Sequence, residues 1–458
     1  MRILLWHGYL MTGSGSNVYT GNIARSWRAA GHDVVVMCQD TLAGSLPYVD
    51  AEADMSPDNS TFVEYPTKAS PAAGRCVVVR PAIGEILPVY VFDEYEGFTA
   101  KLYVDLTDDE LDAYVWRNVE AMVAVIRAHE PDAIITGHEV MGPYIARLAC
   151  EATGTQYVAK LHGSALEYAV KLQDRYRHYA FEGLGAAKRV VGGSNYMIAA
   201  ASAVVPGWTT RATVVNPGCD VDLFRPTERA PGRSARVAGF VGKLIAAKGV
   251  HHFLAALGLT SVPDLRAVVV GYGGFEKELR ALAYTFETEN ASAAARVTSS
   301  NQLEKLADFL ASVEGRADYW ERAAAVPMEF PGRLEHGPLS ETLPHWDVLV
   351  VPSEIPEAFG MVAAEAAACG VLPIVPRHSG IGEAGAAVEE ALDLEGRLSF
   401  DPEKPVEGIA RCLDDVLSWP LEKRRDLGRR AAELARERWS WDTVGARLLE
   451  LATGPGDA

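Results

Sequence analysis

Short runs of apolar, often β-branched residues alternate with helical patterns along almost the whole chain. Examples are RILLWHG, HDVVVMCQ and DAIITGH in the first half, and VAGFVGK, RAVVVGYG and DVLVVPS in the second. Continuous apolar runs are typical of parallel strands that helices cover on both faces. Strands that alternate with helices are joined by right-handed crossovers, which build doubly wound sheets. The pattern therefore predicts an α/β chain made of doubly wound, Rossmann-like sheets.

One interruption of this pattern predicts the domain boundary. A chain of 458 residues has room for two or three domains at about 100–200 residues each. The stretch RPTERAPGRSAR is rich in Pro, Arg and Gly and has no apolar periodicity, so we interpret residues 225–235 as a linker. We expect domains at 1–224 and 236–430, and a last helix at 438–455 that packs back on the first domain. If the domains face each other, the carboxyl ends of both sheets meet at a cleft, where ligands bind in open α/β sheets.

Two segments look like additions to this plan. Residues 276–326 have a charged helical pattern without an obvious strand, and a subunit interface of a homo-oligomer or a lid would both explain them. Residues 85–114 are rich in tyrosine and acidic side chains. These aromatic rings could stack on acceptor sugars or could cover the core.

Charge and cysteine usage limit the class of partner and the compartment. The formal net charge is −18, which disfavours nucleic acid because affinity for it depends on neutralising phosphates. No run of about 18 apolar residues predicts a membrane helix, and MRILLWHGYL is expected to be a buried strand rather than a signal peptide. The cysteines lie apart, without a CxxC pair, which indicates core residues of a cytoplasmic protein and no zinc site. They are Cys38, Cys76, Cys150, Cys219, Cys369 and Cys412.

The segment VPSEIPEAFGMVAAEAAACG, residues 351–370, carries the most chemical information. A strand ends at Ser353, and a helix is predicted to begin near Gly360. The free amides and positive dipole end of such a helix form an anion site that suits a pyrophosphate. Glu357 and Glu365 would accept hydrogen bonds from sugar and ribose hydroxyls, although both could also be solvated surface residues.

Strand ends elsewhere offer cations and glycine turns. FVGKLIAAKGV places Lys243 and Lys248 in a loop after a strand, where they could neutralise a diphosphate leaving group. Two exposed lysines are the plain alternative. VVVGYGG carries Gly271, Tyr272 and Gly273 at the end of the next strand. In the first domain, Gly13 and Gly15 lie between a strand and a helix but lack the full GxGxxG spacing, and His162 follows a strand.

The segment from Glu357 to Glu365 resembles the E-x7-E motif of retaining glycosyltransferases with the two-domain GT-B fold, in particular family 4. The resemblance extends over nearly the whole chain. It implies that Glu357 lies beside the donor sugar and that Glu365 holds the ribose. The backbone of Phe359, Gly360, Met361 and Val362 would cradle phosphate. The catalytic residues would be His162, Lys243, Lys248 and Glu357. Similar enzymes carry Arg at the place of Lys243, which keeps the charge but loses a bidentate fork.

The resemblance also assigns residues with less distinctive local patterns. His162 would lie beside the donor sugar, the Gly271–Gly273 turn near the nucleotide, and the Gly13–Gly15 loop near the donor phosphate. Arg333 and Leu334 would flank the base. Further landmarks near the cleft, for which turn formation is an equal explanation, are Ser194, Asn195 and Asn216.

These observations favour a retaining hexosyltransferase whose donor is a UDP, GDP or ADP sugar, with UDP favoured, and whose acceptor the sequence does not identify. Front-face attack would need neither a metal nor another cofactor, because the departing phosphate removes the acceptor proton. A phosphorylase-like enzyme, a nucleotide-sugar epimerase and an inactive sugar-nucleotide-binding protein are the alternatives. The first would need a lysine-bound pyridoxal group.

Overall fold

The computed structural model describes residues 1–91, 97–227 and 236–455. It divides the chain into two units, Met1–Pro217 together with Trp441–Ala458, and Gly218–Ser440. Residues 218–224, expected in the first domain, belong to the second unit, because the Cys219 amide donates to the Trp439 carbonyl (2.7 Å) and Phe224 is buried in its core. The second unit also continues beyond the expected end at residue 430. Most of the expected linker, 228–235, lies outside the described residues.

A nine-stranded sheet forms the centre of the first unit. Seven parallel strands follow the order β5-β2-β1-β8-β9-β10-β11. Strands before β8 are added on one side of β1, and β8 and the later strands on the other, so the strand order reverses between β1 and β8. This is the doubly wound arrangement that the alternating pattern predicts. The strands are β1 (Arg2–Trp6), β2 (Asp33–Met37), β5 (Arg75–Arg80), β8 (Ala133–Gly137), β9 (Val158–Lys160), β10 (Arg189–Gly192) and β11 (Ala212–Val214).

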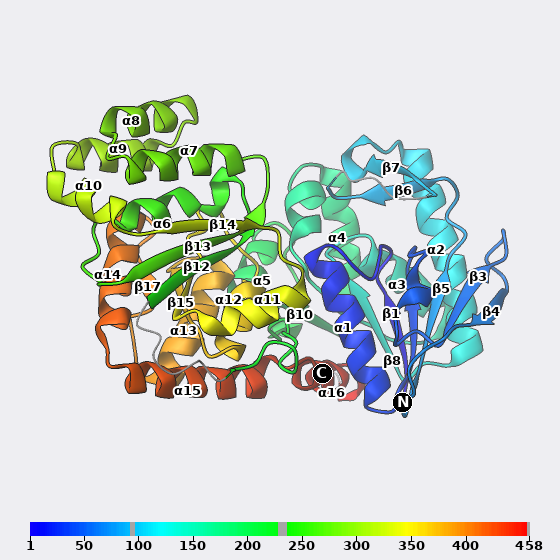
Figure 1. Ribbon diagram of the computed structural model, residues 1–458. Helices are drawn as coiled ribbons and strands as arrows, with labels where there is room; N and C mark the ends of the chain where they lie inside the picture. Colours follow the sequence, from blue (N-terminus) through cyan, green and yellow to red (C-terminus); the bar gives the residue numbers. More distant parts are fainter. Residues whose placement is uncertain (92–96, 228–235, 456–458) are drawn as a thin grey trace. The chain divides into compact units, whose positions relative to one another are not determined.

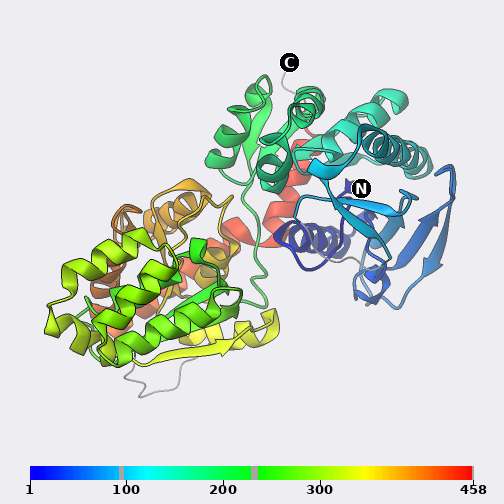
Figure 2. The ribbon, with the colours of Figure 1, turned by 90° about the horizontal axis from the view of Figure 1, so that it is seen from above.

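Strands that the apolar pattern did not predict extend this unit. β3 (Ala51–Met55) adds to β5, and β4 (Phe62–Pro66) pairs with β3 in antiparallel fashion at the outer edge (Figures 1 and 2). β6 (Ile86–Val89) and β7 (Thr99–Leu102) form a separate parallel pair. β4 was not recognised because it is largely exposed and lacks a continuous apolar run.

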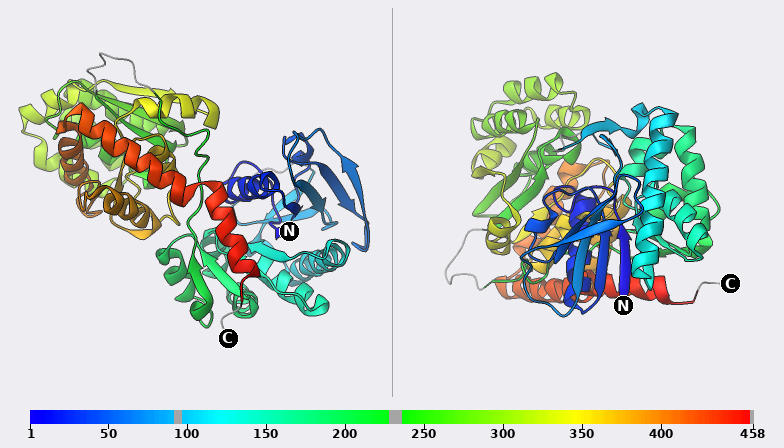
Figure 3. Two further views of the ribbon diagram at one scale, coloured as in Figure 1. Left: turned by 90° about the horizontal axis from the view of Figure 1, so that it is seen from below. Right: turned by 90° about the vertical axis from the view of Figure 1, so that its right-hand side faces the viewer.

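Helices cover both faces of the first sheet. The terminal helix α16 lies beside α1 (Figure 3), and Trp27 Nε1 donates to the Gly445 carbonyl at 2.9 Å. Ser26 and Asp442 add a side-chain hydrogen bond of 2.6 Å, so residues far apart in sequence close one core. The helices are α1 (Gly15–Ala29), α2 (Asp108–His129), α3 (Gly142–Thr153), α4 (Asp174–Ala186), α5 (Asn195–Ser202) and α16 (Trp441–Thr453).

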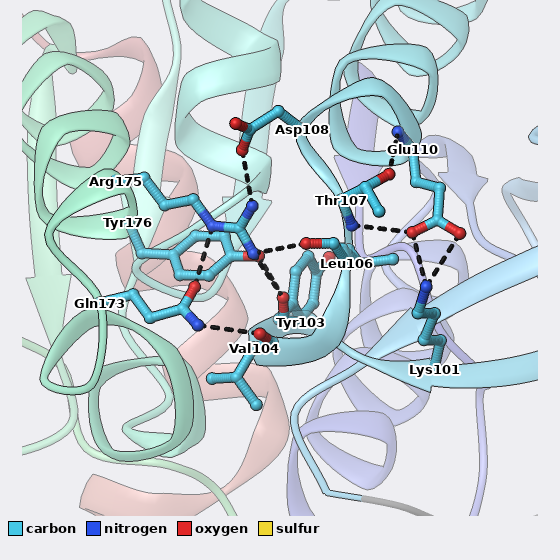
Figure 4. A network of polar contacts seen from close by, with 10 residues as sticks. All are labelled: Lys101, Tyr103, Val104, Leu106, Thr107, Asp108, Glu110, Gln173, Arg175 and Tyr176. Carbon is cyan, nitrogen blue, oxygen red and sulfur yellow. Dashed lines mark hydrogen bonds and ion pairs between the residues drawn. The ribbon is translucent and has the colours of Figure 1, made fainter.

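A polar network fixes the tyrosine-rich segment against α4 (Figure 4). Arg175 donates to the Leu106 carbonyl and to Asp108, both at 2.8 Å, and Gln173 donates to the Val104 carbonyl. Thr107 and Glu110 form a capping box that starts α2. The segment is thereby held so that Tyr103 and Tyr114 are buried. Tyr103 and Tyr114 cover the core, whereas Tyr90 of the same segment lines a cavity of the first unit. Tyr95 lies outside the described residues.

The second unit repeats the doubly wound plan with six parallel strands in the order β14-β13-β12-β15-β16-β17. Numbered within the unit, this is the order 3-2-1-4-5-6, whose direction reverses between β12 and β15. The strands are β12 (Arg236–Lys243), β13 (Leu265–Tyr272), β14 (Met328–Gly332), β15 (Val348–Val350), β16 (Leu372–Pro376) and β17 (Ser399–Phe400).

The segment 276–326 contains four helices and no strand, and it forms the crossover between β13 and β14 (Figure 1). Apolar side chains from each of its helices join the core of the unit, so the segment is an enlarged βαβ connection. Its helices are α7 (Glu276–Glu287), α8 (Ala291–Ser300), α9 (Glu304–Val313) and α10 (Ala317–Ala324). The remaining helices are α6 (Val250–Ala256), α11 (His336–Thr342), α12 (Met361–Ala368), α13 (Ser379–Leu392), α14 (Pro405–Ser418) and α15 (Leu421–Trp439).

Two further predictions concern the cysteines and the membrane. All six cysteines are free and buried, which confirms their interpretation as core residues. None of the helices within the described ranges is both long and apolar enough to cross a bilayer.

Candidate functional site

The candidate site residues of the second unit follow the carboxyl ends of four adjacent strands. Lys243 ends β12, Tyr272 ends β13, Arg333 follows β14, and residues 351–360 follow β15. Because all these strands are parallel, their carboxyl ends lie along one edge of the sheet. The reversal between β12 and β15 lies in the middle of this edge, which is the usual ligand position in such sheets.

The central contact joins two residues that were predicted as site residues from two different segments of the sequence. Lys248 Nζ lies 2.9 Å from Glu357 Oε1. The two side chains are 25% and 16% exposed, so the pair is accessible but partly shielded from water. The lysine ends a short 3₁₀ turn, Ala246–Lys248, and Gly249 follows in the left-handed region (φ 67°). A side chain at Gly249 would put Cβ 2.0 Å from the Pro352 carbonyl oxygen, so glycine lets the two loops touch.

The loop after β15 turns into α12 as the sequence predicted. Gly360 is the N-cap residue with φ 91°, and a Cβ there would lie 2.1 Å from Ile381 Cδ1. Phe359 is buried and meets the Trp439 ring edge to face, with centroids 5.6 Å apart. Met361 and Val362 form the first turn, whose amides have no acceptor within an α-helix. The free amides on which the sequence prediction of a phosphate site rests are therefore present at this terminus.

A histidine relay that the sequence did not reveal holds this loop. His378 Nε2 lies 2.9 Å from the Ser353 carbonyl oxygen, and Nδ1 lies 2.9 Å from Ser379 Oγ. Ser379 Oγ accepts from the Glu357 amide at 3.0 Å, and the Gly380 amide donates to the Glu357 carbonyl at 2.8 Å. Since a carbonyl only accepts, a neutral His378 carries its proton on Nε2 and accepts the Ser379 hydroxyl at Nδ1.

The backbone on both sides of Glu357 is therefore fixed by residues that directly follow β16. In the sequence, the role of His378 could have been inferred only from its position shortly after the end of a strand.

Glu365 lies on α12, and its carboxyl has no hydrogen-bond or ion-pair partner among the described residues. Burial raises the pKa of its carboxyl to about 8. The neighbouring thiols of Cys219 and Cys369 do not compete for protons in this range, because burial raises their pKa values further. A partly buried carboxyl without a partner is suited to accept hydrogen bonds from ligand hydroxyls.

Tyr272 and Arg333 also come together. The Arg333 guanidinium lies 4.8 Å from the centre of the exposed Tyr272 ring and 2.8 Å from Glu335. Such a stacked pair offers a flat surface for a base. Leu334 instead packs partly against the core. Lys243 is exposed and forms no ion pair with any residue that the structure describes.

Gly271 and Gly273 have a structural reason to be glycine. A Cβ at Gly271 would lie 1.9 Å from the Gly242 carbonyl oxygen, and one at Gly273 would lie 2.3 Å from that of Leu244. The loop after β12 therefore packs directly on the end of β13.

In the first unit, a cavity of about 270 Å³ opens at the reversal between β1 and β8. His162 and Gly15 line it, as the sequence proposed for the strand ends of this unit, and Gly13 precedes it with φ 99°. Tyr90 and Val91 come from the tyrosine-rich segment 85–114 that the sequence offered for the acceptor, and Ser14 comes from the Gly13–Gly15 loop. Besides His162 and Gly15, the full set of lining residues is Tyr9, Ser14, Ser16, Asn17, Tyr90, Val91, His138 and Ser164.

Aromatic and imidazole rings dominate this cavity. His138 lies 4.9 Å from His162 and from Tyr90, measured between ring centroids. Burial lowers the pKa of both histidines well below the usual value, so both are neutral at pH 7. His7, behind them, has its pKa lowered to about 4 by burial and contacts Asn17 Oδ1 at 2.9 Å. The cavity is thus polar without carrying charge.

The three proposed cleft residues serve local structure. Ser194 caps α5 by accepting from the Met197 amide at 3.1 Å, and Asn195 is the first residue of that helix. Asn216 Nδ2 donates to the Gly193 carbonyl at 2.8 Å. These contacts agree with turn formation, which the sequence left as an equal explanation beside a position near the cleft.

Two models of known protein families match parts of this chain. Residues 14–218 match the glycosyl transferase 4-like domain, and residues 320–434 match glycosyl transferases group 1. D-inositol 3-phosphate glycosyltransferases from Corynebacterium urealyticum and Thermobispora bispora are 29% and 30% identical over 253 and 257 residues. Each match covers 53% of this chain, and the chain spans about half the length of these curated relatives (50%).

Solved structures share the fold over almost the full length. The Anabaena protein HepE in complex with UDP is similar with a TM-score of 0.59 at 17% identity, covering 98% of this chain and 99% of that chain. Sucrose-phosphate synthase from Thermosynechococcus elongatus gives 0.58 at 17% identity, with 98% of both chains covered. With two doubly wound units and both domain models matched in order, the chain belongs to the GT-B glycosyltransferases of the family 4 type.

Proposed function

We propose that this chain is a retaining hexosyltransferase whose donor is a nucleotide diphosphate sugar. UDP is the favoured nucleotide of the donor, and GDP and ADP are the alternatives. The observation that carries the proposal is the Lys248–Glu357 pair, 2.9 Å apart, in front of the α12 N-terminus at the reversal of the second sheet.

The diphosphate would bind at the Gly360 bend, where the first amides of α12 meet it. Lys248 and Lys243 would balance its negative charge, which grows as the bond to the sugar breaks. Glu365 would accept the ribose hydroxyls, and Tyr272 with Arg333 would flank the base. Glu357, held by Lys248 and by the His378 relay, would accept hydrogen bonds from the donor sugar.

The transfer step proceeds by attack on the same face from which the leaving group departs. The acceptor oxygen forms a bond to the anomeric carbon, and the bond from that carbon to the phosphate oxygen breaks. The acceptor proton moves to the departing phosphate, so no basic side chain is consumed and no metal is required. A neutral His162 donates or accepts a hydrogen bond and does not act as a nucleophile.

The first-unit cavity supports a neutral acceptor. Its described lining residues include no Lys, Arg, Asp or Glu, and both of its imidazoles are uncharged. Burying a phosphate beside such groups would leave its charge unbalanced. We therefore infer a hydroxyl-bearing, uncharged acceptor such as a polyol, a sugar or a phenol. The relatives above, by contrast, are named for D-inositol 3-phosphate.

A thermal-shift panel of UDP, GDP and ADP sugars tests the donor, because a ligand that binds the native state raises its stability. Wild type should respond to one base, and Lys248→Ala should lose that response. Turnover by Lys248→Ala and Glu357→Gln should fall about 10²–10³-fold. Lys101→Ala is the matched control, since Lys101 forms a similar partly exposed pair with Glu110 at 2.6 Å in the first unit.

Wild-type turnover in both site variants would refute this site. Conversion of labelled donor without acceptor would instead indicate an epimerase. Loss of transfer in excess chelator that Mg²⁺ or Mn²⁺ restores would contradict the metal-free step. Faster transfer to a phosphorylated acceptor than to its neutral parent would contradict the acceptor class alone.

A further inference from the structure

Three metal-ligating side chains converge in the second unit outside the Lys248–Glu357 pair. Nε2 of His251 and Nε2 of His252 lie 3.2 Å and 3.4 Å from the same atom, Glu354 Oε1. All three ligand atoms lie within 4.8 Å of one another. The two histidines lie in the first turn of α6, and the glutamate lies in the loop after β15. No sequence motif predicts this cluster, because the histidines and the glutamate are far apart in the sequence and only the order of the strands in the sheet brings them together.

The histidines are buried, and their polar atoms are incompletely satisfied. The His251 and His252 side chains are 1% and 0% exposed. Neither ring nitrogen of His252 has a hydrogen-bond partner among the described residues, and neither has His251 Nδ1. Native structures rarely leave buried polar side-chain atoms unpaired. A cation at the two Nε2 atoms would satisfy one nitrogen of each ring.

The spacing matches the coordination of a small transition-metal ion. Tetrahedral zinc with bonds of about 2.0–2.1 Å places neighbouring ligand atoms about 3.3 Å apart. The two measured separations, 3.2 and 3.4 Å, lie on either side of that value.

The surroundings leave room for a fourth ligand. A cavity of about 480 Å³ borders all three side chains and is otherwise lined in part by Asn301, Gln302, Glu304 and Lys305. The Lys305 ammonium donates to the Pro402 carbonyl at 3.1 Å and to Glu403 at 3.2 Å, so its charge has partners of its own. A water molecule could complete the coordination from the cavity.

We propose that His251, His252 and Glu354 bind one divalent first-row transition-metal ion, with Zn²⁺ as the best match to two imidazoles and one carboxylate. The set has one negative charge and no thiolate, which disfavours Cu⁺, and imidazole ligands disfavour Ca²⁺ and Mg²⁺. The site is structural, and it does not depend on the proposed transfer reaction.

The ion would join the two loops that carry the donor site. His251 lies three residues after Lys248, and Glu354 lies three residues before Glu357. The Glu354 amide already donates to the Ala247 carbonyl at 3.0 Å. Coordination would add a side-chain link at the same place and would thereby hold the loop after β15 against α6.

Titration of the chelator-treated, full-length protein with Zn²⁺ alone tests the site by calorimetry, and Co²⁺ gives a visible ligand-field spectrum for four-coordinate geometry. We expect one ion per chain, a higher melting temperature with Zn²⁺, and a Kd roughly 100-fold weaker in His252→Ala and in Glu354→Gln. Glu354→Gln changes an exposed side chain and should fold normally. His336→Ala, at an exposed histidine of the same unit, is the control and should bind as wild type does.

Equal Zn²⁺ affinity in wild type and Glu354→Gln would overturn the proposal, as would a six-coordinate Co²⁺ spectrum. If His252→Ala does not fold, the Glu354→Gln titration and the wild-type Co²⁺ spectrum decide the matter. The two proposals can fail separately. If the chelator-treated protein still shows a thermal shift with the donor but does not bind Zn²⁺, the metal site is refuted and the transferase proposal stands.

Discussion

Glu365→Gln provides a quantitative test, because it replaces a titrating carboxyl with a neutral side chain of similar shape. Burial raises the pKa of this carboxyl from 4.5 to about 8. A carboxyl with a higher pKa in the folded state binds its proton more tightly when the protein is folded. Its contribution is therefore most favourable below pH 4.5 and is lost progressively as the pH rises towards 8.

The size of the effect follows from the shift. Each pKa unit corresponds to about 1.4 kcal/mol, so wild type should lose about 2 kcal/mol relative to Glu365→Gln between pH 5.5 and 7.5. This figure allows for the partial exposure of Glu365. In a unit of this size the melting temperatures should diverge by roughly 4–8 °C over that range.

Differential scanning calorimetry of both proteins across this pH range, without nucleotide, measures the divergence in the second-unit transition. Glu383→Gln is a control on α13, a helix of the same unit, and should run parallel to wild type. A constant difference between wild type and Glu365→Gln would show that the carboxyl is already ionised and would refute the reasoning. If ribose hydroxyls bind this carboxylate, nucleotide binding to wild type should also release a proton, and the variant should not.

Two predictions concern the backbone around the proposed phosphate site. Gly360→Ala forces a side chain into the left-handed region and against Ile381, so it should cost about 2 kcal/mol or more in thermal unfolding and weaken nucleotide binding in a thermal-shift assay. Gly274→Ala, where a Cβ meets nothing within 4 Å, is its control, and equal effects would contradict the steric argument. His378→Ala leaves the buried Ser353 carbonyl without its partner, so it should cost about 1–3 kcal/mol and raise the donor KM. His336→Ala should change neither quantity, and an unchanged KM in His378→Ala would show that the relay does not position Glu357.

The sequence by itself determined the class of fold and the region of the proposed phosphate site. Apolar strand runs and helical patterns are local, so twelve parallel strands could be recognised without knowing their neighbours. They comprise β1, β2, β5, β8, β9, β10 and β11 in the first unit, and β12, β13, β14, β15 and β16 in the second. The bend at Gly360 and the start of α12 were predictable for the same reason, since a strand, a loop and a helix lie within twenty residues. Lys248 and Glu357 could each be named, but not paired.

Only the tertiary structure decided which of these residues meet. Lys248 and Glu357 are 109 positions apart, and the order of β12 and β15 in the sheet brings their loops together. His378 and Ser379 act through hydrogen bonds to a loop that a different strand precedes, and no local pattern distinguishes them from ordinary turn residues. The tertiary structure alone also decided the lining of the first-unit cavity and the meeting of His251, His252 and Glu354. It likewise decided that residues 218–224 belong to the second unit. Periodicity records which face of an element is buried, whereas a site depends on which strand ends become neighbours, and sheet order sets that.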